Sequence, residues 1–270
     1  MQAGRFHRSA LIGCGILREG EFSVTLTQDW LAAIDGTNAL AATIEFSRHG
    51  LLQHADPVDA ARVMFEDADP VREFPSWPGK RNFEGKLWMV STGRHVPFES
   101  FWERSLLTSL DRTEDVVGVA SQPMWIRWRS PRRSHAPDYF VRRSDGSALL
   151  VDVKPVELIK PEDSIKFELT RRLAAALGWS YLVFDQLPGA TQANLRFLLR
   201  YRDPAWLEGV EIAELGLTGR MSLGSLAAAL GRVARSGVGA AYALVWSGAV
   251  QADLRRPLSM ATVVDLEGGS

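Results

Sequence analysis

The sequence has little cysteine, little lysine and no long apolar run. Its single cysteine, Cys14, excludes an internal disulfide and a zinc site built from several cysteines, which fits a reducing cytoplasm. The apolar stretches at residues 10–17 and 237–246 are far below the roughly 20 residues that a membrane-spanning helix needs, and the first lacks a cleavage pattern. We therefore expect a soluble, cytoplasmic protein with no signal peptide and no membrane contact.

The net charge of -1 gives no general attraction to nucleic acid, so any contact with DNA must be local. Among the 31 basic residues only five are lysines, namely Lys80, Lys86, Lys154, Lys160 and Lys166. In a chain that otherwise uses arginine, a retained lysine hints that a compact ammonium group is needed. Lys154 is therefore of interest before any motif is considered.

The length of 270 residues allows more than one compact domain. The first predicted region, residues 1–85, has no readable role; we expect a strand at 22–27 and a helix at 57–65. It closes with a proline-rich and aromatic segment at 74–79, which suggests a linker or a packed arm.

Residues 86–188 are predicted to form an α/β domain. The expected elements are a helix at 98–110, one bent or two short strands over 116–128, strands at 138–143 and 148–154, a helix at 161–177 and a strand at 181–184. Asp145-Gly146 is typical of the tight turn of an antiparallel hairpin. This order predicts a small α/β sandwich.

The third predicted region, residues 189–270, changes to short helices followed by two extended stretches. The helices are expected at 192–201, 222–230 and 238–246, and the extended stretches at 251–254 and 261–266. This order resembles a winged helix.

A group of acids and one lysine in the second region suggests phosphodiester hydrolysis, which requires a divalent cation held by oxygen ligands. Strand alternation places Asp152 and Lys154 on one face of their strand. Asp138 lies almost as far from the hairpin turn as Asp152, so the two carboxylates and the ammonium group should converge.

Glu103 and Glu99 lie one helical turn apart and repel each other unless a cation compensates. Because Glu103 borders the apolar stripe of its helix, we prefer it to Glu99 as a metal ligand. In this interpretation Asp138 anchors one or two Mg²⁺ ions, for which Mn²⁺ can substitute, and Glu103 and Asp152 complete the shell. Lys154 orients the attacking water or neutralises phosphate charge.

Pro137-Asp138 followed by Asp152-x-Lys154 matches the PD-(D/E)xK nuclease signature. A wider set of residues resembles TnsA-like transposase endonucleases: Thr92-Gly93-Arg94, Glu103, Ser121-Gln122-Pro123, residues 136–140 and residues 151–155. The resemblance implies that Glu103, Asp138 and Lys154 are catalytic. The archetype carries glutamine where this chain has Asp152, and this departure favours metal binding.

The resemblance further implies a restriction-endonuclease-like αβββαβ fold with a winged-helix C-terminal domain. The implied activity is DNA cleavage at transposon ends, as one subunit of a heteromeric transposase that is weakly active alone. The implied partners are double-stranded DNA, a DDE-type integrase of the TnsB kind and an ATPase regulator of the TnsC kind. Two alternatives stay open: a stand-alone restriction or junction-resolving nuclease, and a catalytically silent binding module.

Four arginines interleaved with Trp125 and Trp128 precede the PD strand, and because they flank the proposed site we interpret them as DNA phosphate contacts; a solvated loop is the alternative. They are Arg127, Arg129, Arg132 and Arg133. Three other groups of residues have structural explanations. The tryptophans at 77, 88, 102, 125 and 128 are expected to fill cores. His135 is expected to be structural or solvated, and acids such as Asp163 at a helix start are explained by the helix dipole.

Overall fold

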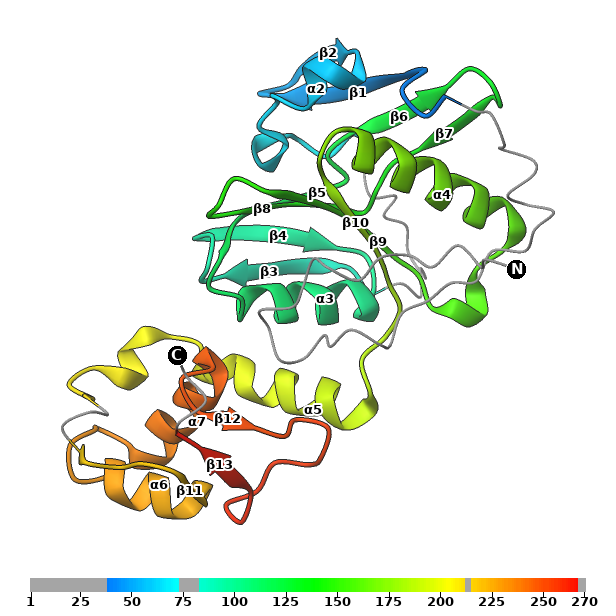
Figure 1. The fold of residues 1–270 in the computed structure, drawn as a ribbon. Helices are drawn as coiled ribbons and strands as arrows, with labels where there is room; N and C mark the ends of the chain where they lie inside the picture. Colours follow the sequence, from blue (N-terminus) through cyan, green and yellow to red (C-terminus); the bar gives the residue numbers. More distant parts are fainter. Residues whose placement is uncertain (1–37, 73–82, 212–214, 267–270) are drawn as a thin grey trace. The chain divides into compact units, whose positions relative to one another are not determined.

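The computed structural model describes residues 38–72, 83–211 and 215–266, and shows a mixed α/β protein with several sheets (Figure 1). It divides into two compact units. The first comprises the described residues up to Leu107 together with Thr113–Gln186, and the second comprises Thr108–Arg112 and the described residues from Leu187 onward. None of the helices in the described part of the chain is long and apolar enough to cross a membrane. The predicted strand at 22–27 and the segment 74–79 lie outside the described residues.

The central sheet of the first unit has four strands in the order β10-β9-β8-β5. The strands are β5 (Val116–Ser121), β8 (Tyr139–Arg143), β9 (Ala148–Val153) and β10 (Ser180–Phe184). The pairs β5–β8 and β8–β9 are antiparallel, whereas β9 and β10 are parallel and are connected through helix α4 (Pro161–Ala176). Gly146 has φ 83°, which confirms the predicted tight turn between β8 and β9.

A second sheet combines strands from the N-terminal part of the first unit with strands from the middle of its sequence. Its order is β2-β1-β6-β7, with β2 (Leu51–Ala55), β1 (Ala42–Arg48), β6 (Trp125–Trp128) and β7 (Arg133–His135). The segment expected as one bent or two short strands is thus two strands, β5 and β6, in different sheets. Strands β1 and β2 were not predicted. They bring residues 42–55 into the same unit as the central sheet.

The helix expected at 57–65 is wrong in extent. The structure has only a four-residue helix α2 (Pro57–Ala60) and a separate 3-10 turn η1 (Phe65–Asp67). Helix α2 has no side-chain cap and no basic residue in its last turn, and so short a helix is marginal without tertiary packing. The break lets the Phe65 side chain become fully buried.

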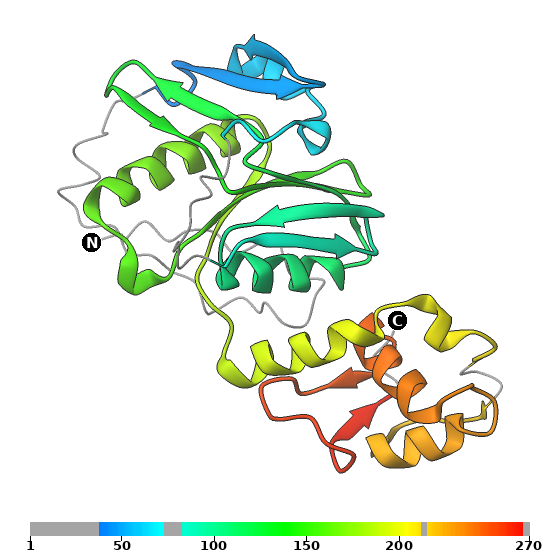
Figure 2. The ribbon, with the colours of Figure 1, turned by 180° about the vertical axis from the view of Figure 1, so that it is seen from behind.

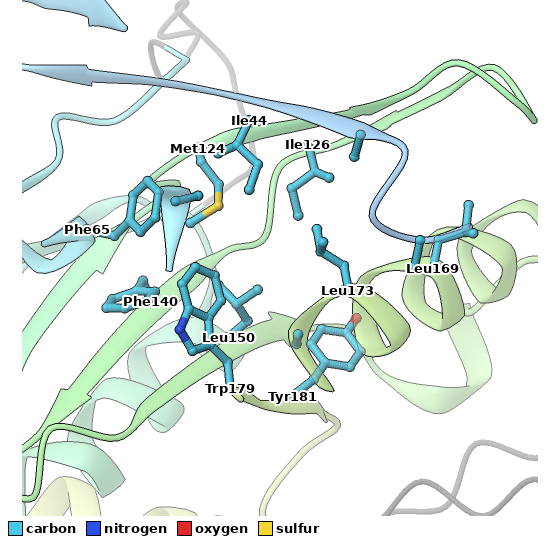
Figure 3. Close-up of a cluster of buried hydrophobic side chains, with 14 of the residues drawn as sticks. Ile44, Phe65, Met124, Ile126, Phe140, Leu150, Leu169, Leu173, Trp179 and Tyr181 are labelled. Carbon is cyan, nitrogen blue, oxygen red and sulfur yellow. The ribbon is translucent and has the colours of Figure 1, made fainter. Parts of the chain in front are cut away.

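Phe65 belongs to the hydrophobic core that joins the two sheets to helix α4 (Figure 3). Its ring lies 5.1 Å from that of Phe46 on β1, 5.6 Å from that of Phe140 on β8 and 5.8 Å from that of Trp179. Ile44, Met124 and Ile126 cover the core from the β1–β6 side, and Leu169 and Leu173 from α4. The second sheet is therefore part of the structure that supports β8 and β9.

A two-stranded hairpin, β3 (Gly85–Met89) and β4 (Arg94–Phe98), precedes helix α3 (Phe101–Asp111). Gly85 meets the Phe98 ring so closely that an added Cβ would lie 2.7 Å from it. Helix α3 begins three residues later than expected, because Phe98 is the last residue of β4. The expectation that tryptophans are buried holds for Trp128 and is wrong for Trp88 and Trp102, which are exposed.

The second unit combines helices with a three-stranded antiparallel sheet in the order β11-β13-β12 (Figure 2, lower part). Its elements are α5 (Gly189–Leu198), the 3-10 turns η3 (Leu199–Tyr201) and η4 (Pro204–Leu207), β11 (Arg220–Ser222), α6 (Leu223–Leu230), α7 (Gly237–Ser247), β12 (Gln251–Ala252) and β13 (Val263–Asp265). The three predicted helices are confirmed, the first ending earlier in a 3-10 turn. Strand β11 was not predicted.

Candidate active site

Asp138 lies immediately before β8, where this strand meets β9. Tyr139 pairs with Val151, so the next position of the ladder brings Asp138 beside Asp152. The Asp138 carboxylate accepts a hydrogen bond of 2.7 Å from the backbone N–H of Val153. The residue is partly buried at the end of the sheet. The convergence of Asp138 and Asp152 that the hairpin predicts is thus present in the backbone.

The acidic surroundings of Asp138 disfavour its charged form. Burial raises the pKa of this carboxyl well above its usual value, and the negative charges of Asp152 and Glu103 raise it further. The hydrogen bond from Val153 and the positive charge of Arg72 act in the opposite direction. Asp152 and Glu103 therefore lie close enough to Asp138 to influence its protonation.

Glu103 is held in the first turn of α3 by three donors. Its carboxylate accepts hydrogen bonds from the backbone N–H of Glu99 at 2.8 Å, from the Ser100 hydroxyl at 2.9 Å and from the Tyr139 hydroxyl at 3.1 Å. Burial nevertheless raises the pKa of Glu103, and the nearby Glu99 carboxylate adds to this effect. The bond from Tyr139 attaches Glu103 to the residue that directly follows Asp138.

Gln122 connects Glu99 with the strand end that carries Asp138. Its Nε2 donates to a Glu99 carboxylate oxygen at 2.7 Å, and its backbone N–H donates to the Asp138 carbonyl at 2.8 Å. Its Oε1 is buried and has no hydrogen-bond partner. Gln122 adopts φ 46°, a left-handed conformation that costs energy for a residue other than glycine. This turn directs the chain from β5 into the second sheet.

Asp152 is only 2% exposed and is held by two side chains that the sequence did not connect with it. The Tyr181 hydroxyl donates a short hydrogen bond to its carboxylate, and His135 Nε2 lies 2.9 Å from both carboxylate oxygens. The ring of His135 also contacts that of Phe167 on α4. Asp152 thus faces α4, whereas Glu103 is attached to the α3 side of the sheet through Tyr139.

Lys154 forms an ion pair with Asp163 near the start of α4, with Nζ and Oδ2 2.8 Å apart. Asp163 also binds the Lys166 ammonium group at 3.0 Å and accepts a hydrogen bond from the backbone N–H of Lys160 at 3.1 Å. Burial works to raise the pKa of Asp163, but these bonds outweigh it and lower the pKa to about 2. The helix dipole alone therefore does not account for Asp163. The scarcity of lysine in the sequence was the feature that could have pointed to these ion pairs.

The described part of the chain contains no group of three or more His, Cys, Asp or Glu side chains placed to hold one metal ion. Asp152 and Glu103 instead point their carboxylates at neutral donors and at His135. Asp138 fits a hard divalent cation, because its oxygens are crowded by like charges that a cation would compensate. Glu103 and Asp152 would have to exchange their present hydrogen bonds to join it.

The four arginines before the PD strand differ in their surroundings. Arg127 pairs with Glu45 at 3.0 Å and lies 5.2 Å above the Trp125 ring. Arg133 donates to the carbonyl of Arg132, and the side chains of Arg129, Arg132 and Arg133 are exposed along the turn between β6 and β7. Arg127 is thus already neutralised by an acid, whereas the other three present positive charge to solvent.

The chain matches no protein-family model and no curated protein. The chemistry of the site is therefore inferred from its own geometry.

Proposed function

We propose that this chain is a metal-dependent DNA endonuclease whose site is built around Asp138. The observation that carries this proposal is the position of Asp138 at the end of the central sheet, beside Asp152 and Glu103, with Lys154 two residues beyond Asp152. Acids collected in this way repel one another, and a divalent cation is the usual compensation in hydrolytic sites. With β6 and β7 set aside as strands of the second sheet, the element order α3-β5-β8-β9-α4-β10 supports a restriction-endonuclease-like core.

In the proposed reaction a bound Mg²⁺ ion, or Mn²⁺ in its place, supplies a Lewis acid for a phosphate oxygen and acidifies a water molecule. Asp138 would be the main ligand of the ion, with its carboxylate positioned by the hydrogen bond from the Val153 N–H. Glu103 and Asp152 would complete the set of carboxylates that hold the ion, which would require them to give up hydrogen bonds such as those to Ser100 and His135. Lys154 leaves Asp163 to neutralise the phosphate or orient the water.

The TnsA-like resemblance adds the substrate and partners of the proposal: transposon ends, a TnsB-like DDE integrase and a TnsC-like ATPase. The order α5-β11-α6-α7-β12-β13 supports a winged helix in the second unit. In DNA-binding winged helices a helix of this motif enters the major groove. Helix α7 contains no lysine or arginine, and Gly239–Trp246 is buried. This argues against α7 as a DNA-reading helix, and the partner proposed for the second unit is therefore another protein of the transposase.

The test is cleavage of a supercoiled plasmid by the full chain in Mg²⁺ and in EDTA, with and without the candidate partner subunits. Asp138→Ala should abolish Mg²⁺-dependent cleavage. Asp56→Asn is the matched control, because Asp56 is an exposed acid of the same unit with no capping hydrogen bond, and it should cut like the native chain. Cleavage that survives Asp138→Ala would refute the site. Efficient cutting without partners would favour a stand-alone nuclease over a transposase subunit.

A further inference from the structure

Arg72 brings a positive charge from the N-terminal region to the acidic site. The backbone N–H of the preceding residue, Val71, donates to the Gln122 carbonyl at 2.9 Å, and the N–H of Gln122 donates to the Asp138 carbonyl at 2.8 Å. These two bonds fix the segment that carries Arg72 beside the strand end that carries Asp138. The guanidinium Nη2 lies 3.7 Å from a Glu99 carboxylate oxygen.

We propose that Arg72 binds a phosphate of the DNA backbone at the Asp138 site, so that residues before the predicted nuclease domain complete its substrate contacts. This rests on the proposed endonuclease function. In their ionised forms Glu99, Glu103 and Asp138 repel a phosphate, and a cation beside them would offset that repulsion. The planar guanidinium donates paired hydrogen bonds that match phosphate oxygens.

The contacts of Arg72 leave it available for this role. Its side chain is 46% exposed, and at 3.7 Å its pairing with Glu99 is longer than a hydrogen bond. Glu99 is also bound by Gln122 Nε2 at 2.7 Å, so its position does not depend on Arg72. Lys154, the other basic side chain of the site, is paired with Asp163. Arg72 is therefore better placed than Lys154 to meet an incoming phosphate.

The test measures binding of a short DNA duplex to the full chain in EDTA, by fluorescence anisotropy at several salt concentrations. Arg72→Gln should weaken binding by roughly 3–10-fold and reduce the slope of log affinity against log salt by about 1, as expected for one lost phosphate contact. Arg72→Lys should restore the slope but only part of the affinity. Arg62→Gln, at an exposed arginine of the same unit, should leave both unchanged.

Glu99→Gln separates phosphate binding from a purely structural role. If Arg72 binds phosphate, removing the Glu99 charge should leave affinity equal or tighter, since the arginine is freed and one repulsion is lost. Equal weakening by Arg72→Gln and Glu99→Gln, or unchanged binding by Arg72→Gln, would overturn the inference. If the inference about Arg72 is overturned in this way but the native chain still cuts DNA in an Asp138-dependent manner, the proposed function stands. A native chain that neither binds nor cuts DNA would overturn both.

Discussion

Replacing Asp138 by asparagine should stabilise the protein in the absence of metal ions. Burial, Asp152 and Glu103 together raise the pKa of Asp138 well above its usual value. At pH values between the ordinary aspartate pKa and this raised pKa, the folded state therefore holds a proton that the unfolded chain has already released. As pH rises from the ordinary aspartate pKa toward the raised one, folding loses free energy, and above the raised pKa the full penalty is present. Asparagine carries no charge and escapes this penalty.

The magnitude follows from the linkage between pKa and stability. Each unit by which folding raises the pKa corresponds to about 1.4 kcal/mol. Asparagine keeps a carbonyl oxygen for the Val153 N–H, so the one bond that favours the present conformation survives. We expect the free energy of unfolding at pH 8 in EDTA to rise by about 1 kcal/mol or more. The melting temperature should rise by about 2–4 °C for each kcal/mol.

The assay is thermal unfolding of the native chain and Asp138→Asn across pH 4 to 9, in EDTA and then in increasing Mg²⁺. The difference between the two proteins should be small at pH 4 and grow with pH. Mg²⁺ should reverse the order, because binding to the native carboxylates stabilises by about 2.7 kcal/mol at one hundred times the dissociation constant. Asp56→Asn serves as the control that should show neither effect.

Two outcomes would refute this reasoning. A variant that is less stable than the native chain in EDTA at pH 8 would show that Asp138 contributes attractive contacts that outweigh the repulsion. A native chain whose melting temperature does not respond to Mg²⁺ would show that the acids do not hold the ion in the absence of DNA, and would remove Asp138 as its anchor.

Two further substitutions test the packing around the site. Asp163→Asn should lower the free energy of unfolding at pH 7 by about 1 kcal/mol. The lowering of the pKa to about 2 corresponds to a larger free energy, but solvent screening of the partly exposed lysines reduces it. Urea unfolding should show that this loss fades as pH falls from about 4 toward 2, where native Asp163 becomes protonated. Gly118→Ala should cost about 1–3 kcal/mol, because its Cβ would lie 2.7 Å from that of Glu66, whereas Gly189→Ala, with open space around it, should be neutral in the same thermal assay.

The local features of the β8–β9 hairpin were readable from the sequence. Asp145-Gly146 indicates the turn, and alternation on both sides of it places Asp138 beside Asp152, as the observed register has them. These features depend on residues within about fifteen positions of one another. The helices α3 and α4 were predicted for the same reason, since apolar spacing along one element is enough to reveal it.

The partners of the acidic side chains were not readable, because they come from distant parts of the chain. Asp152 on β9 accepts a hydrogen bond from Tyr181 on the parallel neighbour β10. His135, on the edge strand β7 of the second sheet, lies within hydrogen-bond distance of the same carboxylate. Pairing between β1 and β6 joins residues about eighty positions apart, and the sequence does not encode such a register locally. A left-handed turn at Gln122, which has no glycine to announce it, hid the change of sheet between β5 and β6.

The pairing of β1 with β6 also limits how this protein can be divided or exchanged. Ile44 of β1 lies opposite Ile126 of β6, and both are fully buried. A fragment that starts at residue 86 would lose β1 and Phe65, leave the β6 edge unpaired and open the core above β8. Chimeras and expression fragments should therefore carry residues 38–72 together with the central sheet. Homologous recombination within this gene would preserve the packed core of the first unit only when both segments come from one parent.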